Sequence, residues 1–301
     1  MENNKKHSQE YLGEARDYWW NDDFLCLLAK RLNLSECTTL VDIGCGKGYL
    51  AYMFAPYLNS NAKVYGFDKE QQWIDDAIVR TKTFSNTNDV NFYFQVGDAY
   101  KIPVENSLSD ITVCQTLLIH LNNPIAAINE MKRITRDGGL VVAIEPNNII
   151  NSLVADSLSD DDINDKVELL EIQLRIELGK KLLGEGYNSV GDLIPQMFKE
   201  SGLKDIQVWL CDKPLSIIPP YDTREKILRV QETLTWLERE EVYLDYQGQL
   251  RYFLGGGGTE EKFNNHWIKT KTKMERLKSA LENETYISSG GSIMYIVAGR
   301  K

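Results

Sequence analysis

Short apolar runs alternate with amphipathic stretches over the first half of the chain. A continuous apolar run bounded by turn residues predicts a buried strand, and apolar positions three and four apart predict a helix that faces a core. The pattern predicts strands at 40–43, 64–67, 91–95, 111–114 and 140–145, and helices at 22–32, 49–58, 70–83 and 124–135. Strands that alternate with helices predict an α/β fold with a parallel sheet and right-handed crossovers.

The domain organisation follows from where this alternation holds and where it breaks. We expect an N-terminal helical segment, a core that carries the alternation, and two polar, helically spaced insertions that interrupt the core. In order along the chain these are 1–34 (helical segment), 35–150 (core), 151–188 (insertion), 189–211 (core), 212–289 (insertion) and 290–301 (last core strand).

A run of four glycines, 255–258, lies in the second insertion. A phosphate-binding loop needs a strand before its glycines and a Lys-Ser/Thr pair after them, and this run has neither. We therefore expect a flexible loop here and no phosphate cradle.

The densest candidate chemistry follows the first predicted strand, in Asp42-Ile43-Gly44-Cys45-Gly46-Lys47-Gly48. Glycines 44, 46 and 48 have no Cβ, so a ligand can lie against the backbone there, and the next helix directs N–H groups at it. Asp42 adds a fixed negative charge, which would repel a pyrophosphate and attract an ammonium group. S-adenosylmethionine, which carries both an ammonium and a carboxylate, fits this loop better than a dinucleotide.

Polar residues also end the following strands. Asp68 comes about twenty residues after the loop, where an acid can accept hydrogen bonds from both ribose hydroxyls, although it could instead cap the next helix. Lys69 follows it and joins the cofactor-binding candidates. Asp98 and Ala99 come after the third strand and could bind the adenine edge, although Gly-Asp is also a common turn. Gln115 ends the fourth strand and could contact the amino-acid end of the ligand.

Four residues are candidates on the acceptor side. His120 is either a substrate contact or base, or a histidine satisfied by a nearby carbonyl. Glu145 and Asn147 end the fifth strand and are expected on one rim, where they could orient a substrate and Glu145 could accept its proton. Trp19 lies in an aromatic N-terminal segment that could fold over the ligand and shield a sulfonium, or could only pack the first helix on the sheet.

Composition narrows the class of partner. The formal net charge of −10 gives no global attraction to a phosphate backbone, so nucleic acid is not an expected partner. No apolar run approaches the roughly 20 residues that span a bilayer, and the polar residues 1–9 do not resemble a signal peptide. Five cysteines are scattered without a Cys-x-x-Cys pair, which indicates reduced thiols in the cytoplasm and no zinc site.

Taken together, these motifs resemble class I S-adenosylmethionine-dependent methyltransferases. The resemblance is carried by the Asp-x-Gly-x-Gly-x-Gly loop, Asp68 after strand two, Gly97-Asp98 after strand three and Gly138-Gly139 before strand five. Leu118-Ile119-His120-Leu121-Asn122-Asn123-Pro124 is similar to the small-molecule branch typified by ubiquinone-biosynthesis enzymes, except that Ile119 stands where a second histidine is often found.

The resemblance implies a Rossmann-like, seven-stranded, mostly parallel sheet of order 3-2-1-4-5-7-6 whose last strand is antiparallel. It implies that Asp42, Gly44 and Gly46 hold the methionine end, Asp68 the ribose, and Asp98 with Ala99 the adenine. The expected activity is methyl transfer from S-adenosylmethionine to a small-molecule acceptor, with S-adenosylhomocysteine as product. The insertions would cap the acceptor site, or could equally serve a homodimer.

Two other functions remain open from the residues alone. Gly46-Lys47-Gly48-Tyr49-Leu50-Ala51 fits the end of an NAD(P) fingerprint, although Asp42 would repel its pyrophosphate. A non-catalytic S-adenosylmethionine-binding module would use the same loop. For the enzyme we expect in-line displacement with no firmly assigned base, because alignment supplies about 7–11 kcal/mol and a base only about 3–5 kcal/mol.

Overall fold

The computed structural model describes residues 13–84, 88–159, 162–238 and 245–301, so the polar stretch 1–9 lies outside the described residues. The chain divides into two compact units, each built from segments that are distant in sequence. The core unit contains residues 20–147, 189–212 and 294–301, and the helical unit contains residues 13–19, 148–188 and 213–293.

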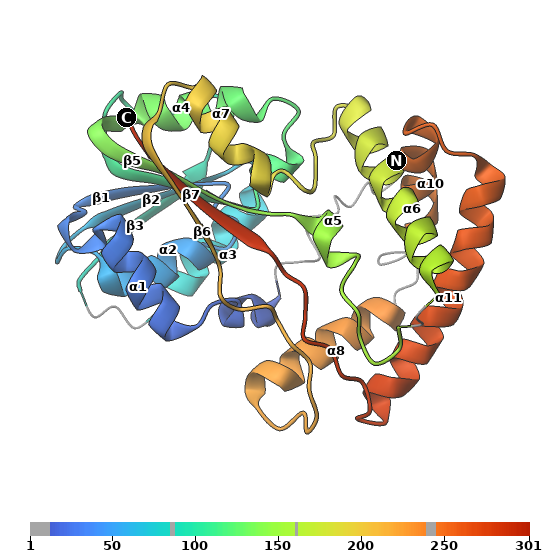
Figure 1. The fold of residues 1–301 in the computed structure, drawn as a ribbon. Coiled ribbons are helices and arrows are strands. Elements are labelled where there is room, and N and C mark those ends of the chain that lie inside the picture. The colour runs from blue at the N-terminus through green and yellow to red at the C-terminus, as the bar shows by residue number, and fades with distance from the viewer. Residues whose placement is uncertain (1–12, 85–87, 160–161, 239–244) are drawn as a thin grey trace. The chain divides into compact units, whose positions relative to one another are not determined.

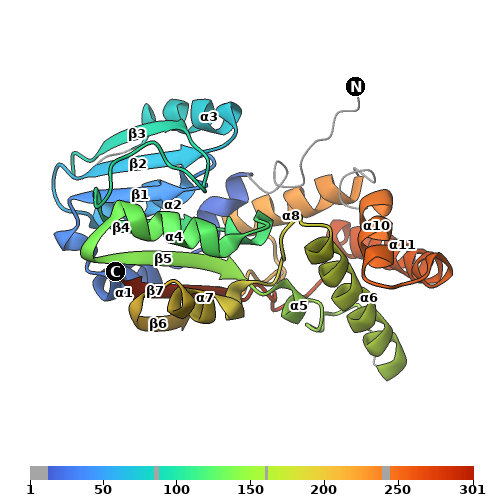
Figure 2. The ribbon, with the colours of Figure 1, turned by 90° about the horizontal axis from the view of Figure 1, so that it is seen from above.

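The core unit is a seven-stranded sheet of order β3-β2-β1-β4-β5-β7-β6 (Figures 1 and 2). Neighbouring strands among β1 to β5 pair in parallel, whereas β7 pairs antiparallel with both β5 and β6. The expected fold class and strand order are confirmed. The strands are β1 (Thr39–Ile43), β2 (Lys63–Asp68), β3 (Asn91–Val96), β4 (Ser109–Gln115), β5 (Thr135–Pro146), β6 (Lys204–Leu210) and β7 (Met294–Arg300).

Strand burial follows position in the sheet. In central β1, Leu40, Val41 and Ile43 are at most 1% exposed, because helices cover both faces of a parallel sheet. Edge strands β3 and β6 keep several exposed residues. The continuous apolar run that predicted β1 is therefore the signature of a strand buried on both sides.

Helices lie on both faces of this sheet. In Figure 1, α4 and α7 lie on one face and α1, α2 and α3 on the other. The expected helix at 49–58 ends early, because Pro56 has no N–H to continue the helical hydrogen bonds and the chain tightens into a 3-10 turn. The helices are α1 (Asp22–Leu32), α2 (Tyr49–Phe54), α3 (Gln71–Thr81), α4 (Pro124–Ile134) and α7 (Ile194–Glu200).

None of the described residues of the helical unit belongs to a strand of the sheet. Its helices are α5 (Asn148–Asn151), α6 (Ile163–Leu182), α8 (Arg224–Glu238), α10 (Tyr246–Gly255) and α11 (Glu260–Glu282), with a 3-10 helix at Glu14–Tyr18. One apolar cluster joins α6, α10 and α11 through residues such as Ile172, Phe253 and Phe263, which are fully buried. A second cluster joins α8 to the end of α11. No helix in the described ranges has the length and apolar character needed to cross a membrane.

The prediction of a flexible four-glycine loop is wrong. Gly256 lies so close to α6 that a Cβ on it would come 2.0 Å from the Arg175 carbonyl oxygen. The Arg175 guanidinium donates to the carbonyl oxygens of Gly256 (3.2 Å) and Gly257 (2.8 Å). The glycines therefore allow two helices to approach closely. This contact joins residues about 80 positions apart, which local sequence cannot reveal.

Candidate functional site

The candidate site begins at the glycine loop between β1 and α2. Gly44, Gly46 and Gly48 have φ values of +69°, +51° and +77°, the left-handed region where glycine is favoured. The N–H groups of Gly44 and Cys45 donate to the Phe67 carbonyl oxygen at 2.7 and 3.0 Å. The loop is thus bent back onto the end of β2 and leaves its backbone at the carboxyl edge of the sheet.

Asp68, at the end of β2, fastens this loop to the segment before α3. Its Oδ2 accepts from the Gly46 N–H (2.9 Å) and its Oδ1 from the Glu70 N–H (3.0 Å). Burial raises the pKa of Asp68, and the N–H groups of Glu70 and Gly46 oppose that shift. The Lys69 N–H also lowers the pKa of Asp68. Because a carboxylate has about four acceptor positions, one remains for a ribose hydroxyl.

Asp42 supplies a second carboxylate beside the same loop. It lies near the end of β1, is 1% exposed and is in register with Gly66 and Val113 of the flanking strands. Burial, followed by the negative charges of Asp42 and Asp68, raises the pKa of the Cys45 thiol well above its ordinary value. The loop therefore lies in a negative field, which favours a ligand with a cationic group and opposes a pyrophosphate.

Lys47 and Lys69, both near this edge, differ in their surroundings. The Lys47 ammonium contacts the Asp76 carboxylate at 3.2 Å and lies 5.3 Å from the centre of the Trp73 ring. Lys69 is exposed directly after Asp68. Its proposed contact with the cofactor stays a prediction.

Asp98 and Ala99 lie on the segment that leaves β3, the strand beside β2. The Asp98 carboxylate accepts from the Tyr100 N–H at 2.9 Å, as the turn interpretation expected, and the Tyr100 hydroxyl accepts from the Asn123 N–H at 3.2 Å. The backbone turn and an adenine contact do not exclude each other, because Oδ2 is not used in that turn.

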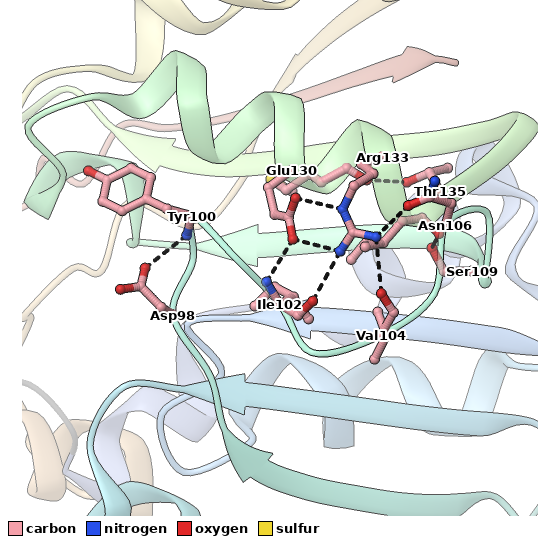
Figure 3. Close-up of polar contacts among 11 residues, drawn as sticks. Asp98, Tyr100, Ile102, Val104, Asn106, Ser109, Glu130, Arg133 and Thr135 are labelled. Carbon is pink, nitrogen blue, oxygen red and sulfur yellow. Dashed lines mark hydrogen bonds and ion pairs between the residues drawn. The ribbon is translucent and has the colours of Figure 1, made fainter.

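A pair on α4 holds the continuation of this segment (Figure 3). Glu130 accepts from the Ile102 N–H at 2.7 Å, while Arg133 donates to the Ile102 and Val104 carbonyl oxygens at 3.0 Å each. Arg133 also forms two bonds with Glu130, of 2.7 and 2.8 Å. Burial raises the pKa of Glu130, but the Arg133 guanidinium and the Ile102 N–H outweigh burial and hold this pKa below its ordinary value. The sequence does not reveal this clamp of Glu130 and Arg133 on the backbone of Ile102 and Val104, since Glu-x-x-Arg on a helix is a common surface pair.

Gln115 and the turn after it lie at the end of β4, beside β1. Gln115 is 6% exposed, and Thr116 has a left-handed φ of +52°. A single 3-10 turn, η5 (Leu118–His120), follows and leaves His120 exposed at its end. Gln115 therefore lies at the expected edge, and His120 lies on the surface of the core unit.

Glu145 lies near the end of β5, where its side chain is enclosed by protein. Its side chain is fully buried, and Oε1 accepts from the N–H groups of Leu117 (2.9 Å) and Leu118 (2.8 Å). Burial raises its pKa to about 7, against these N–H donors. Strand alternation does not show that the turn after β4 folds over this position, and the proposed role of Glu145 towards a substrate stays a prediction. Asn147 is 7% exposed and donates to the Asp192 carboxylate at 3.1 Å.

Trp19 belongs to the helical unit, where the Arg16 guanidinium lies 4.6 Å from the centre of its ring. Its sulfonium-shielding role stays a prediction. Among the residues with described positions, no three His, Cys, Asp or Glu side chains form a group that could hold a metal ion.

The fold thus brings the predicted cofactor residues to one edge. Parallel strands β3, β2, β1 and β4 are adjacent, so their carboxyl ends meet there. Asp98, Asp68, Asp42 and Gln115 stand at these ends, in that order across the sheet, with the glycine loop next to Asp42. The arrangement can hold a ligand that combines a ribose with a cationic group.

A family model and two relatives show what this chain is similar to. A family model described as a methyltransferase domain matches residues 34–201. An uncharacterized methyltransferase of Schizosaccharomyces pombe is 28% identical over 167 residues, 54% of this chain and 58% of that protein. A demethylmenaquinone methyltransferase of Staphylococcus aureus is 24% identical over 116 residues, 38% of this chain and 46% of that protein. The matched part of the chain thus spans about half the length of these relatives.

The fold also matches a solved structure. A candidate methyltransferase from Bacillus halodurans superposes with a TM-score of 0.51 at 16% identity and covers 93% of this chain and 99% of that chain. At that identity the likeness establishes the fold.

Proposed function

Because the chain belongs to the methyltransferase domain family, we propose that it transfers the methyl group of S-adenosylmethionine to a small-molecule acceptor by in-line displacement. The observation that carries the proposal is the pair of carboxylates at the glycine loop. Asp68 binds the loop backbone and keeps an acceptor position for a ribose, and Asp42 adds a second negative charge.

The residues are assigned as follows in this proposal. Asp42 and the backbone of Gly44, Gly46 and Gly48 receive the methionine end, together with Gln115. Asp68 receives the ribose hydroxyls. Asp98 and the Ala99 N–H receive the adenine edge. Glu130 and Arg133 hold the continuation of this segment.

The chemistry places few demands on the protein. The bound sulfonium supplies an electrophilic methyl group and a neutral thioether leaving group. The chain's residues have to align donor and acceptor, which can supply about 7–11 kcal/mol of the barrier. A general base would add about 3–5 kcal/mol, and neither exposed His120 nor buried Glu145 is assigned that role.

Acceptor choice is assigned to the helical insertions, and above all to residues 212–289, which lie outside the matched methyltransferase domain. Residues shared by a domain family serve what its members have in common, the cofactor. Segments outside the domain are free to differ with the acceptor. The acidic net charge of −10 supports a small molecule over a nucleic acid.

The test is methyl transfer with the full chain. Purified protein is incubated with methyl-labelled S-adenosylmethionine and separate pools of phenols, amines and thiols, and the labelled product and S-adenosylhomocysteine are both measured. We expect label in a small molecule with an equal amount of S-adenosylhomocysteine. Label found only in added protein or RNA would contradict the proposed acceptor class, and cofactor binding without any turnover would favour a binding module.

A further inference from the structure

Glu145 makes contacts that neither a direct contact with the cofactor nor a general-base role explains. It is the last charged residue of β5 and its side chain is 0% exposed. Its Oε1 receives the consecutive N–H groups of Leu117 and Leu118, which follow β4. Within the described residues, its Oε2 is buried and has no hydrogen-bond partner. Burying a carboxylate is unfavourable, so its position requires a reason.

The turn that Glu145 holds packs against the glycine loop. A Cβ placed on Gly44 would come 2.8 Å from Cδ1 and 3.1 Å from Cβ of Leu117. The Leu117 side chain therefore lies against the Gly44 backbone. The Gly44 N–H meanwhile donates to the Phe67 carbonyl oxygen at 2.7 Å. Gly44 is thus held by β2 through a hydrogen bond and by the turn after β4 through a packing contact.

The backbone of this turn needs such support. Thr116 has a left-handed φ of +52°, which is uncommon for a β-branched residue and persists only where surrounding contacts impose it. The Thr116 N–H donates to the Ile144 carbonyl oxygen (2.9 Å), so β5 holds both sides of the turn, one through its backbone and one through Glu145.

We propose that Glu145 is a positioning residue for cofactor binding, whose buried carboxylate holds Leu117 against Gly44 and thereby fixes the glycine loop in its ligand-binding form. It acts through Leu117 and does not touch the ligand. This inference needs only cofactor binding at the glycine loop and is independent of which acceptor is methylated.

The surroundings of Glu145 predict a pH dependence of this effect. Cys114 on β4 approaches Oε1 at 3.9 Å, Asp42 on β1 lies close enough to raise the pKa of Cys114, and Tyr295 on β7 is in register with Glu145. Burial in these surroundings raises the pKa of Glu145 to about 7. An ionised carboxylate accepts N–H groups more strongly than the neutral acid, so the turn is held more tightly above that pH.

The experiment is a double-mutant cycle read out by calorimetric titration with S-adenosylhomocysteine. Glu145→Gln, Leu117→Ala and the double variant are compared with the unmodified protein between pH 5.5 and 8.5. We expect each single substitution to raise the Kd about tenfold at pH 8 and the double variant to be little worse than either, since both break one contact chain. Glu145→Gln should also remove the decrease in Kd that the unmodified protein shows as the pH rises through about 7.

A matched control separates positioning from stability. Glu177→Gln also alters a buried glutamate, 5% exposed, that accepts a backbone N–H at 2.9 Å from Asn188, but in the helical unit. It should lower thermal stability and leave the Kd unchanged. Leu117→Met, which roughly conserves the side-chain volume, should retain affinity.

The proposal is overturned by either of two results. One is that Glu145→Gln and the unmodified protein have the same Kd across the pH range. The other is that the two single effects multiply independently in the double variant. If Glu145→Gln does not fold, an unchanged Kd in folded Leu117→Ala overturns it just as well, because the packing contact with Gly44 would then have no effect. Failure of the unmodified protein to bind would instead contradict the cofactor itself.

Discussion

Asp68 connects the glycine loop, the start of α3 and the proposed ribose contacts. Asp68→Ala removes the acceptor of the Gly46 N–H and any ribose bond together. We expect S-adenosylhomocysteine binding to weaken by about 1–3 kcal/mol, measured by calorimetry. Asp110 provides the control, because it also accepts two backbone N–H groups, from Thr38 and Thr39, but near the amino end of β4. Asp110→Ala should lower stability with the Kd unchanged, and an unchanged Kd in Asp68→Ala would refute the ribose assignment.

Glu145 also makes stability depend on pH. Its pKa is about 7 in the folded protein and 4.5 as an ordinary value. Between these pH values the folded protein keeps a proton that the unfolded chain has lost, so the free energy of unfolding falls as pH rises. The loss is roughly 3 kcal/mol across the window. Denaturant unfolding at pH 5 and pH 8 should show a smaller fall for Glu145→Gln than for the unmodified protein. Equal falls would show that Glu145 does not titrate in this window.

At the scale of elements, helix α4 determines where the segment after β3 lies. Its start is fixed by Pro124 and by Asn123, whose side chain accepts from the Ala126 N–H at 3.1 Å. Its last turn carries Arg133, which binds the segment leading away from Asp98 (Figure 3). One helix thereby orients the proposed adenine-binding turn.

Arg133→Lys tests this clamp. Lysine cannot bind Glu130 at two points and also reach two carbonyl oxygens, so we expect a loss of about 1–3 kcal/mol in stability and a higher Kd for S-adenosylhomocysteine. Lys132→Ala is the control on the same helix, since Lys132 donates to the Ser201 carbonyl oxygen at 2.7 Å, towards α7. Thermal unfolding measures the stability of both variants, and calorimetry measures their Kd for S-adenosylhomocysteine. Equal Kd values for the two variants would mean that the clamp does not support cofactor binding.

In the helical unit, the crossing of α6 and α10 depends on glycine. Gly256→Ala would place a methyl carbon 2.0 Å from the Arg175 carbonyl oxygen, and the helices would have to separate. We expect a stability loss of at least about 1–3 kcal/mol in urea unfolding. Gly138→Ala has open space around its Cβ, so only its positive φ should matter and the loss should be smaller. Equal losses would contradict the close-packing explanation.

At the scale of the whole molecule, local patterns were enough for the fold of the core unit. The buried apolar runs predicted strands, and the family resemblance implied the order 3-2-1-4-5-7-6, which is confirmed. The acids after successive strands were found from the sequence because parallel strands place their ends at one edge. Elements that depend on long-range packing were not predictable, as Glu145 under its turn and Gly256 against Arg175 illustrate.

We infer that the negatively charged glycine loop selects a nucleoside with a cationic amino acid over a dinucleotide. The most direct measurement is a pair of calorimetric titrations of the full chain, one with S-adenosylhomocysteine and one with NAD⁺. We expect saturable binding of one S-adenosylhomocysteine per chain and no heat with NAD⁺. Saturable binding of NAD⁺, or no heat with S-adenosylhomocysteine, would contradict this inference.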